Sequence, residues 1–385
     1  MSARLLRNPR TSLLALACVA ALVVPSAAFA AAADPLTQKF QTKATAGVER
    51  LLDEMAGRRG HVSGRSYRDG VWLGDPKCWW CSVAPVLPAA VLARLQGGAS
   101  RWMPIAQDTV QATIRRYQQA DGSFATSPAD AQFGTFVTGR YLAAAYLELE
   151  PYLSPQRRAQ WRGAIARAAR WLVPRLRYYV NGNVNLGETV FVYLAWRVTG
   201  EAALGRAYRR SLRFTLAPGR GHPGYGLRYL DRPRHADGRD GAGYLAEGLV
   251  GATPGFDTNY TLVQNGHAAM LYAFSRSARS RRLLNLLTNA LVRRAGRSWL
   301  IPAINGSRHP GTRSVVGYES SGLAIAALAA GRRDLRPRVL DQLAHVLRGF
   351  HSLLTQGPGH QDSVSEFATA LIALQPPGAV SGRRR

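Results

Sequence analysis

Lysine, cysteine and acidic residues are all scarce in this sequence. Only Lys39, Lys43 and Lys77 are lysines, so arginine supplies the other 47 of the 50 basic residues. The 23 acidic residues leave a formal net charge of +27. Such a surplus favours a polyanionic partner, such as an anionic polysaccharide or a cell-wall polymer. The hydrophobic fraction of 46% is normal for a globular chain and excludes disorder as the main state.

Several sequence signatures of other protein classes are absent. No apolar run after residue 30 is long enough to predict a membrane span. The chain lacks a Gly-x-Ser-x-Gly elbow, a His-Glu-x-x-His motif and a phosphate-binding Gly-Lys-Ser/Thr motif. Asp231, Asp237 and Asp240 are conceivable calcium ligands, but the arginines between them oppose that reading. We therefore predict neither a cofactor nor a metal site.

Residues 1–30 have the features of a secretory signal peptide. Three arginines precede an apolar stretch, which ends in the small-x-small pattern Ala28-Phe29-Ala30. Cleavage after Ala30 removes three basic residues and no acid, which lowers the formal charge from +27 to +24. The expected mature protein is a single domain over 31–378 with a basic tail at 379–385. It is expected to be secreted or extracytoplasmic, where nucleic acid is not an expected partner.

Cys78 and Cys81 are the two cysteines of this mature chain, in the sequence Cys-Trp-Trp-Cys. An exported protein meets oxidising conditions, so we predict a disulfide between them. A redox-active pair is the alternative, because this spacing lowers thiol pKa values in some proteins. A structural zinc ion needs about four ligands, and no second Cys/His pair has suitable spacing.

Apolar periodicity, caps and breakers predict a mature chain that is almost entirely helical. The twelve expected helices span 35–56, 80–97, 100–119, 131–149, 155–179, 187–199, 201–216, 257–276, 278–295, 317–331, 333–353 and 363–374. The odd-numbered helices are amphipathic and rich in arginine, which is typical of an outer layer facing solvent. The even-numbered helices are rich in small and apolar residues and are apolar nearly all round, which indicates an inner layer.

The connections between these helices alternate in length. An even helix leads into the next odd one through a few residues. An odd helix leads into the next even one through a long or polar segment, at 57–79, 120–130, 180–186, 217–256, 296–316 and 354–362. Short connections join antiparallel neighbours, so the long ones gather at the opposite end. Six helical hairpins, with all the long connections at one end, predict an all-α (α/α)6 toroid. A two-layer solenoid and an irregular helical bundle are the alternatives.

This pattern resembles the α/α-toroid carbohydrate-active enzymes, which include glycoside hydrolases and polysaccharide lyases. The Asp-Gly-Ser-Phe turn at 121–124 follows two glutamines at 118–119 and is similar to a turn in hyaluronate and chondroitin lyases. It also resembles repeats of the terpenoid cyclase toroids. The catalytic histidine that follows this turn in those lyases has no counterpart at 125–132, and the Asp-rich cyclase motifs are absent. The resemblance implies the fold and a carbohydrate substrate, without a catalytic set.

Polar residues recur where the even helices begin, at the end that carries the long connections. Helix N-termini expose unpaired N–H groups and a positive dipole end, which favour anions. The residues are Asn183, Asn185, Glu188, Asp257, Asn259, Tyr260, Tyr318, Glu319, Asp362 and Glu366. Asp and Asn are also the usual helix N-caps, so capping is the alternative to a functional cleft.

The segment 257–267 gives the strongest signal. Asp257, Tyr260, Gln264 and His267 are spaced by three, four and three residues, which places them on one helical face. A polar stripe on an otherwise apolar inner helix needs partners, because buried polar groups are normally hydrogen-bonded. The stripe is either a wall of a substrate channel or a structural network, and His267 is alternatively a core histidine.

Long loops and two tryptophans add candidate binding groups. The loop at 217–256 contains Tyr225, and the loop at 296–316 contains Arg308 and His309. Long structured loops in compact domains are often binding lids. Trp79 and Trp80 precede the second helix, where indole rings either stack on sugars or fill the rim.

The positive charge favours, as the main hypothesis, a polysaccharide lyase that cleaves a uronic-acid polymer by β-elimination. Tyr260 with His267 or His309 would transfer the protons. Asn185, Asn259 or Arg308 would hold the carboxylate, with Gln264 and Tyr318 as further binding residues.

A glycoside hydrolase is the second hypothesis. It needs two carboxyl groups, and the candidate pair is Asp257 with Glu188 or Glu319. The recurrence of carboxylates at one rim favours this function. The third hypothesis is a non-catalytic protein that binds the cell wall or a polysaccharide, because a fold alone does not determine function.

Overall fold

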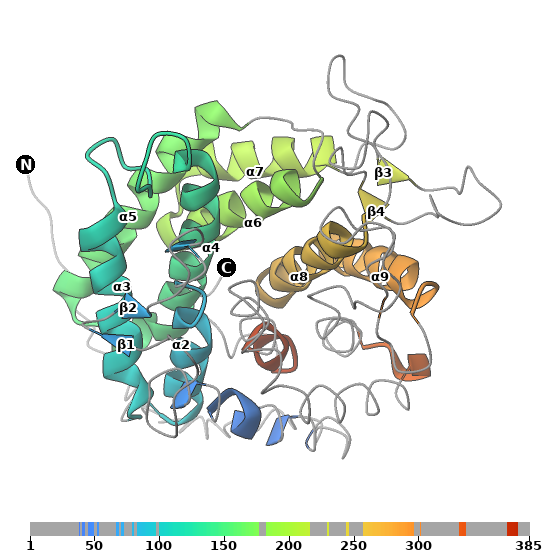
Figure 1. Cartoon of the computed structure of the whole chain (residues 1–385), viewed down its shortest axis with the longest axis horizontal. Helices are drawn as coiled ribbons and strands as arrows, with labels where there is room; N and C mark the ends of the chain where they lie inside the picture. The colour runs from blue at the N-terminus through green and yellow to red at the C-terminus, as the bar shows by residue number, and fades with distance from the viewer. Residues whose placement is uncertain are drawn as a thin grey trace, which may run out of the picture.

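The computed structural model describes residues 38, 41–42, 45–49, 52–53, 67–68, 71–72, 79–80, 83–97, 100–176, 182–215, 229–230, 244–245, 257–295, 301, 331–335 and 368–375. Four long helices of this part form an inner layer: α2 (Val86–Leu95), α4 (Ala131–Leu149), α6 (Gly182–Thr199) and α8 (Thr258–Ser275). Each packs against the next along the chain, and most of their residues are buried. The inner layer therefore curves through the molecule as one wall (Figure 1).

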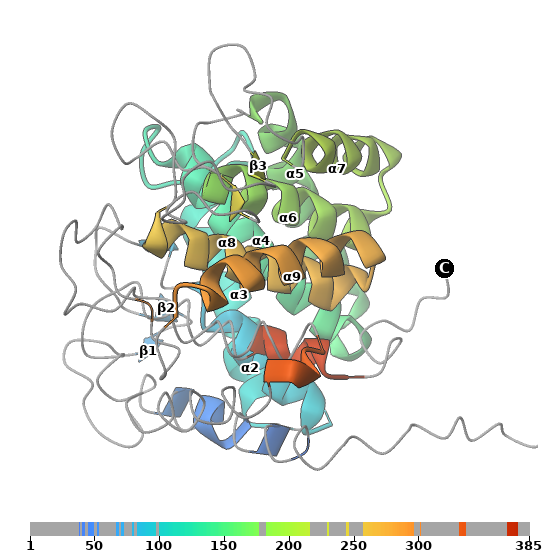
Figure 2. The ribbon, with the colours of Figure 1, turned by 90° about the vertical axis from the view of Figure 1, so that its right-hand side faces the viewer.

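Four other helices lie outside this wall. They are α3 (Trp102–Tyr117), α5 (Pro155–Leu172), α7 (Ala202–Thr215) and α9 (Ala278–Val292). Each packs on the inner helix that precedes it, and α5 also contacts α6. Each buries one face and exposes the other, as their arginine-rich amphipathic sequences predict. Figure 2 shows α7 and α9 on the outside of α6 and α8.

The tight turns from an inner to an outer helix depend on left-handed residues. Gly97, Gly200 and Gly331 have φ values of 84°, 75° and 72° at three of the expected short connections. Glycine tolerates this region without steric penalty and is the usual residue after a helix C-terminus. Arg276 takes the same conformation after α8, with φ 51°. These turns bring all described inner helices to the same orientation, with their N-termini at the end of the long connections.

Within two of these connections lie short antiparallel strand pairs. β1 (Tyr67–Arg68) pairs with β2 (Val71–Trp72). β3 (Tyr229–Leu230) pairs with β4 (Tyr244–Leu245). The sequence predicted only loops there, but pairs of two residues leave the fold class all-α.

The predicted helices agree with the structure best where the periodicity is longest. The helix expected over 131–149 is α4 without any change of bounds. The helix expected from 187 begins at Gly182, because the polar residues around Asn183 and Asn185 are its first turn and not its loop. The helix expected over 155–179 ends as α5 at Leu172, and η3 (Val173–Arg175), which contains Pro174, follows it.

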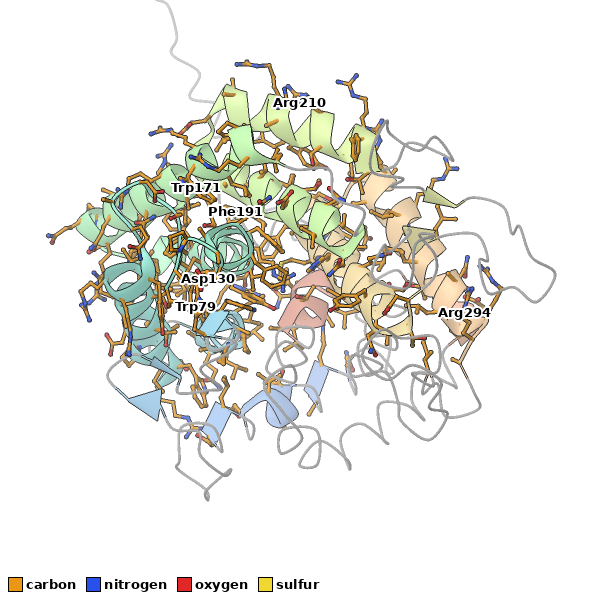
Figure 3. All side chains as sticks on the ribbon, turned by 45° about the horizontal axis from the view of Figure 1, so that its top comes forward. Trp79, Asp130, Trp171, Phe191, Arg210 and Arg294 are labelled. Atoms are coloured by element: carbon orange, nitrogen blue, oxygen red, sulfur yellow. The ribbon has the colours of Figure 1, made fainter. Side chains whose placement is uncertain are left out.

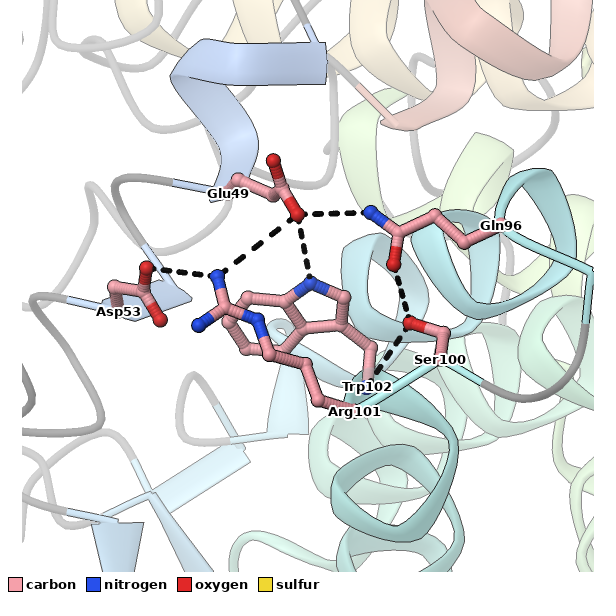
Figure 4. A network of polar contacts seen from close by, with 6 residues as sticks. All are labelled: Glu49, Asp53, Gln96, Ser100, Arg101 and Trp102. Carbon is pink, nitrogen blue, oxygen red and sulfur yellow. Dashed lines mark hydrogen bonds and ion pairs between the residues drawn. The ribbon is translucent and has the colours of Figure 1, made fainter.

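A polar network ties the N-terminal segment to the turn between α2 and α3. The Arg101 guanidinium lies 2.9 Å from the Asp53 carboxylate and 3.9 Å from Glu49. Glu49 also accepts hydrogen bonds from Gln96 (2.8 Å) and from the Trp102 indole (3.3 Å) (Figure 4). The described residues of 45–53 are helical, as predicted.

Charged side chains meet where the inner helices end. Glu148 near the end of α4 is fully buried and lies 2.5 Å from Arg94 Nε of α2. Arg276 at the end of α8 acts on the same carboxylate electrostatically, and burial raises the pKa of Glu148 against the effect of both arginines. Arg276 also donates to the carbonyl groups of Ile372, Ala373 and Gln375. The last described helical turn, 368–373, is thereby joined to α8 at this end of the molecule.

Candidate functional site

Seven of the predicted site residues lie on α6 and α8 or at their N-termini, and six of them are buried: Asn185, Glu188, Asp257, Asn259, Gln264 and His267. Tyr260, the seventh, is half-buried. The structure therefore concentrates them at the end of the inner layer that carries the long connections. The stripe from Asp257 to His267 follows one face of α8, as its spacing predicted.

Asp257 is the N-cap of α8. Its Oδ1 accepts the backbone N–H of Tyr260 at 2.9 Å, and the side chain is fully buried. An Asp in this position stabilises a helix by satisfying one of its free N–H groups. The capping role is thus established for one carboxylate oxygen of Asp257.

His267 contacts Arg140 of α4 across the inside of the wall. Because α6 lies between α4 and α8, the side chains of Arg140 and His267 meet over the surface of α6. Gly187 is the α6 residue at the crossing. A Cβ atom there would lie 2.6 Å from Phe136 and 2.9 Å from His267 Nε2. The missing side chain of Gly187 therefore makes room for the contact.

The His267–Arg140 contact fixes the protonation state of the imidazole. A guanidinium has only N–H donors, so a ring nitrogen of His267 must be the acceptor. Burial, and secondly the Arg140 charge, hold the pKa of His267 well below its usual value. Arg140 also donates to the Tyr141 hydroxyl at 2.9 Å. The result is a neutral histidine beside a buried guanidinium.

Glu188 and Asn185 are the predicted site residues of α6. Glu188 Oε1 accepts a hydrogen bond of 2.6 Å from Gln132 of α4, and Gln132 also donates to the Arg175 carbonyl beyond α5. Asn185 lies one turn before Thr189, which contacts Ser211 of α7 at 2.7 Å. Glu188 therefore faces the inner helix α4, and Asn185 lies on the same side of α6 as Thr189.

Asn259 is fully buried, yet neither of its amide atoms has a hydrogen-bond partner within the described part of the chain. A buried amide without partners is costly, by about 1–3 kcal/mol for each unsatisfied group. Asn265, in contrast, accepts from Thr288 of α9 at 3.3 Å. Asn259 is therefore the polar side chain of α8 that is best placed to accept a partner from outside the fold.

The two tryptophans have different surroundings. Trp79 is buried, stacks on Tyr117 with ring centroids 4.4 Å apart, and donates to Asp130 at 2.8 Å. Burial acts to raise the pKa of Asp130, but hydrogen bonds from Thr126, Ser127 and Trp79 lower it below its usual value. The structure thus gives Trp79 a packing role beside α4, whose N-cap is Asp130 (Figure 3).

Trp80 belongs to an aromatic row that leads into the wall. It meets Phe133 edge-on at 5.2 Å, and Phe133 meets Phe136 at 4.9 Å. Phe133 is 38% exposed, whereas Phe136 is buried against Gly187. The aromatic row therefore runs from the surface to the contact between His267 and Arg140.

Sequence reasoning missed Arg140, Phe133 and Phe136 as members of this site. Arg140 carried a signal, since it is the one charged residue in the middle of the apolar inner helix α4. Phe133 and Phe136 carried none, because aromatic residues in an inner helix are expected in the core.

The Asp-Gly-Ser-Phe turn has a structural role. Asp121 accepts from the Ser123 backbone (2.9 Å) and hydroxyl (2.7 Å) and from the Trp171 indole (2.8 Å). Gly122 has φ 97° and lies so close to the Arg167 backbone that a Cβ would come within 2.9 Å of it. The turn therefore fastens the start of α4 to α5.

Several predicted residues lie outside the described part of the chain: Cys78, Cys81, Tyr225, Arg308, His309, Tyr318, Glu319 and the segment 1–30. Among the residues that the structure does describe, no group of His, Cys, Asp and Glu is arranged to hold a metal ion. No described helix is long and apolar enough to cross a membrane.

Comparison with known proteins gives structural matches only. No family model matches the sequence, and no curated protein does. An unsaturated glucuronyl hydrolase from Bacillus sp. GL1 matches with a TM-score of 0.51 at 12% identity, over 88% of this chain and 96% of the other. Its counterpart from Streptococcus agalactiae matches with a TM-score of 0.51 at 10% identity, over 88% and 90%.

A family 76 glycoside hydrolase from a bovine Bacteroides thetaiotaomicron strain matches as well. Its TM-score is 0.50 at 9% identity, over 86% of this chain and 77% of the other. Structural matches at sequence identities this low show a shared fold and do not establish a shared function. The predicted fold is confirmed: this chain has the (α/α)6-toroid architecture of these carbohydrate-active enzymes.

Proposed function

We propose that the protein is a glycan-degrading enzyme, and specifically a glycoside hydrolase. The observation that carries the proposal is the aromatic row from exposed Phe133 and half-buried Trp80 to the polar interior at His267 and Arg140. Aromatic faces suit the apolar faces of sugar rings, and buried polar groups suit their hydroxyls. The architecture shared with glycoside hydrolases supports the same conclusion.

The chemistry would use two carboxyl groups. One protonates the glycosidic oxygen, and the other activates a water molecule or attacks the sugar carbon directly. Asp257 is the first candidate, because it is buried at the N-terminal end of α8 and caps the helix with one oxygen. Its partner would be Glu188, which is also buried, or Glu319.

β-Elimination of a uronic-acid polymer is the second candidate function. Arg140 favours it, because a buried guanidinium would neutralise a substrate carboxylate. The state of His267 opposes it, since a ring-nitrogen lone pair is already occupied by Arg140 and burial holds the pKa of His267 well below its usual value. A lyase would therefore depend on Tyr260 for proton transfer.

Product analysis distinguishes the two reactions. The purified protein is incubated with a panel of neutral and acidic glycans. New reducing ends without ultraviolet absorbance from a conjugated double bond are expected, because hydrolysis adds water across the bond. Reducing ends accompanied by that absorbance would instead establish elimination. Binding without any turnover would support the non-catalytic alternative.

Two variants test the assignment of residues. Tyr260→Phe is expected to keep most turnover in a hydrolase and to abolish it in a lyase that uses the phenol. Glu188→Gln is expected to lose turnover only if Glu188 is the second carboxyl group. Asp108→Asn, on the exposed face of α3, is the matched control.

We also propose that the protein acts after export, with residues 1–30 as the leader. Its partner would then be an extracellular glycan. Mass spectrometry of the protein recovered from the culture medium tests this, and an N-terminus at residue 31 is expected.

A further inference from the structure

The outer face of α7 carries a row of arginines without acidic residues. Arg206, Arg209, Arg210 and Arg213 are all exposed, and α7 contains no Asp or Glu. None of the four forms an ion pair in the part of the chain that the structure describes. Arg210 extends away from the fold in Figure 3.

The outer helix α9 also begins with exposed arginines. Arg279 and Arg282 are exposed there, and α9 also contains no acidic residue. We call the exposed surface of α7 the α7 face: Arg206, Arg209, Arg210 and Arg213.

The fold does not explain this concentration of charge. Like charges three or four residues apart destabilise a helix by roughly 0.2–0.5 kcal/mol per pair. Three arginines of α5 have partners inside the molecule: Arg170 pairs with Glu201 at 2.6 Å, Arg167 donates to Gln118, and Arg162 donates to the Thr199 carbonyl. Among the described rings, the four arginines of α7 contact only Trp196, which lies 6.0 Å from the Arg209 guanidinium. Within the described residues, no carboxylate therefore pairs with an arginine of the α7 face.

We propose that the α7 face binds a linear anionic polysaccharide, at a site separate from the catalytic end of the toroid. Guanidinium groups bind carboxylates through two parallel hydrogen bonds, which suits uronic-acid residues. Arg206, Arg210 and Arg213 follow one another along about 10 Å of helix, so they face successive charges of an extended chain. Bound polymer would hold the enzyme near its substrate.

Other polyanionic partners fit this face less well. Binding of single-stranded nucleic acid uses exposed aromatic rings as stacking platforms. A membrane-surface helix presents apolar side chains to the lipid. The large apolar side chains that are exposed in the described structure are Leu95, Phe133 and Tyr152, and none of them lies on α7 or α9.

The test compares two variants with the same change of charge. In the first, Arg206, Arg209, Arg210 and Arg213 are replaced by Gln. In the matched control, Arg115, Arg116, Arg157 and Arg158 are replaced by Gln, all exposed on α3 and α5. Binding to polygalacturonate is measured by calorimetry at low and at physiological salt, with dextran as the neutral probe.

The α7 variant is expected to bind polygalacturonate about tenfold or more weakly, while the control keeps its affinity within about twofold. Wild-type binding is expected to weaken with salt, and dextran is expected not to bind. Equal losses in both variants would overturn the proposal, because they would show attraction by net charge alone. Absence of binding, or stronger binding to duplex DNA or to phosphatidylglycerol vesicles, would also overturn it.

The experiment does not depend on the proposed hydrolase activity. The Asp257→Asn variant is expected to bind polygalacturonate as the wild type does. The α7 variant is expected to cleave a short soluble substrate at the wild-type rate. Loss of turnover in the first and loss of polymer binding in the second therefore report on separate sites.

Discussion

At the scale of single residues, Asp257 combines a known structural role with a proposed chemical one. The free energy of unfolding of the Asp257→Asn variant should lie within about 0.5 kcal/mol of the wild-type value, because Asn also caps helices well. Its turnover should fall by about 10²–10⁴-fold if the carboxyl group transfers a proton. Urea unfolding and initial rates measure the two effects separately. Unchanged turnover on a confirmed substrate would leave Asp257 as a cap only.

His267 should make the stability depend on pH. Its folded-state pKa lies well below the unfolded value of about 6.5, because burial and Arg140 disfavour the imidazolium. As the pH falls below that unfolded value, the unfolded chain takes up a proton that the folded chain does not. The free energy of unfolding should therefore decrease on acidification and be fully retained above about pH 7.

The comparison is with His267→Gln, whose side-chain oxygen still accepts from Arg140. Thermal or urea unfolding of both proteins between about pH 7.5 and 5.5 should give a steeper decline for the wild type. Parallel declines would assign the pH dependence to other groups.

At the scale of helices, Gly187 tests the close approach of α4, α6 and α8. Gly187→Ala places a Cβ 2.6 Å from Phe136 and 2.9 Å from His267, so it should destabilise the protein by about 1–3 kcal/mol. Gly163→Ala on α5 is the control, since its Cβ would meet only the Arg167 side chain at 3.7 Å. That change should stabilise by about 0.4–1 kcal/mol. A stable Gly187→Ala protein would contradict the packing at the crossing.

Helix periodicity and alternating connections were enough to predict the inner and outer layers. Each expected helix that falls wholly within the described residues is present, with ends that differ by a few residues. The start of α6 was harder to predict. Asparagine usually favours turns, whereas Asn183 and Asn185 are buried in a helix here.

The site was only partly predictable. The stripe on α8 followed from local spacing. The contact between His267 and Arg140 joins residues 127 positions apart across a third helix, and no local pattern encodes it. The same holds for the aromatic row, whose members look like core residues until the exposure of Phe133 is known.

At the scale of the whole molecule, the charged network of Arg94, Glu148 and Arg276 joins helices from distant parts of the chain. Arg94→Met should destabilise the protein by about 3 kcal/mol, because it leaves the buried Glu148 carboxylate without its nearest partner. The loss should shrink as the pH falls, since burial already raises the pKa of Glu148 and the protonated form is less costly to bury.

The double variant Arg94→Met, Glu148→Leu should recover much of this stability, because it removes both charges together. A double-mutant cycle from urea unfolding measures the coupling. Additive effects of the two changes would show that the pair is not coupled.

Arg276 joins α8 to a segment of the chain that is synthesised much later. Its guanidinium donates to carbonyl groups that lie 96, 97 and 99 positions later in the sequence. During synthesis these acceptors emerge long after α8, so every earlier helix can form while this junction stays open. We expect a chain that stops before residue 368 to contain most of its helices and yet remain susceptible to proteases. The final segment would complete the fold, and this late completion is compatible with the export proposed above.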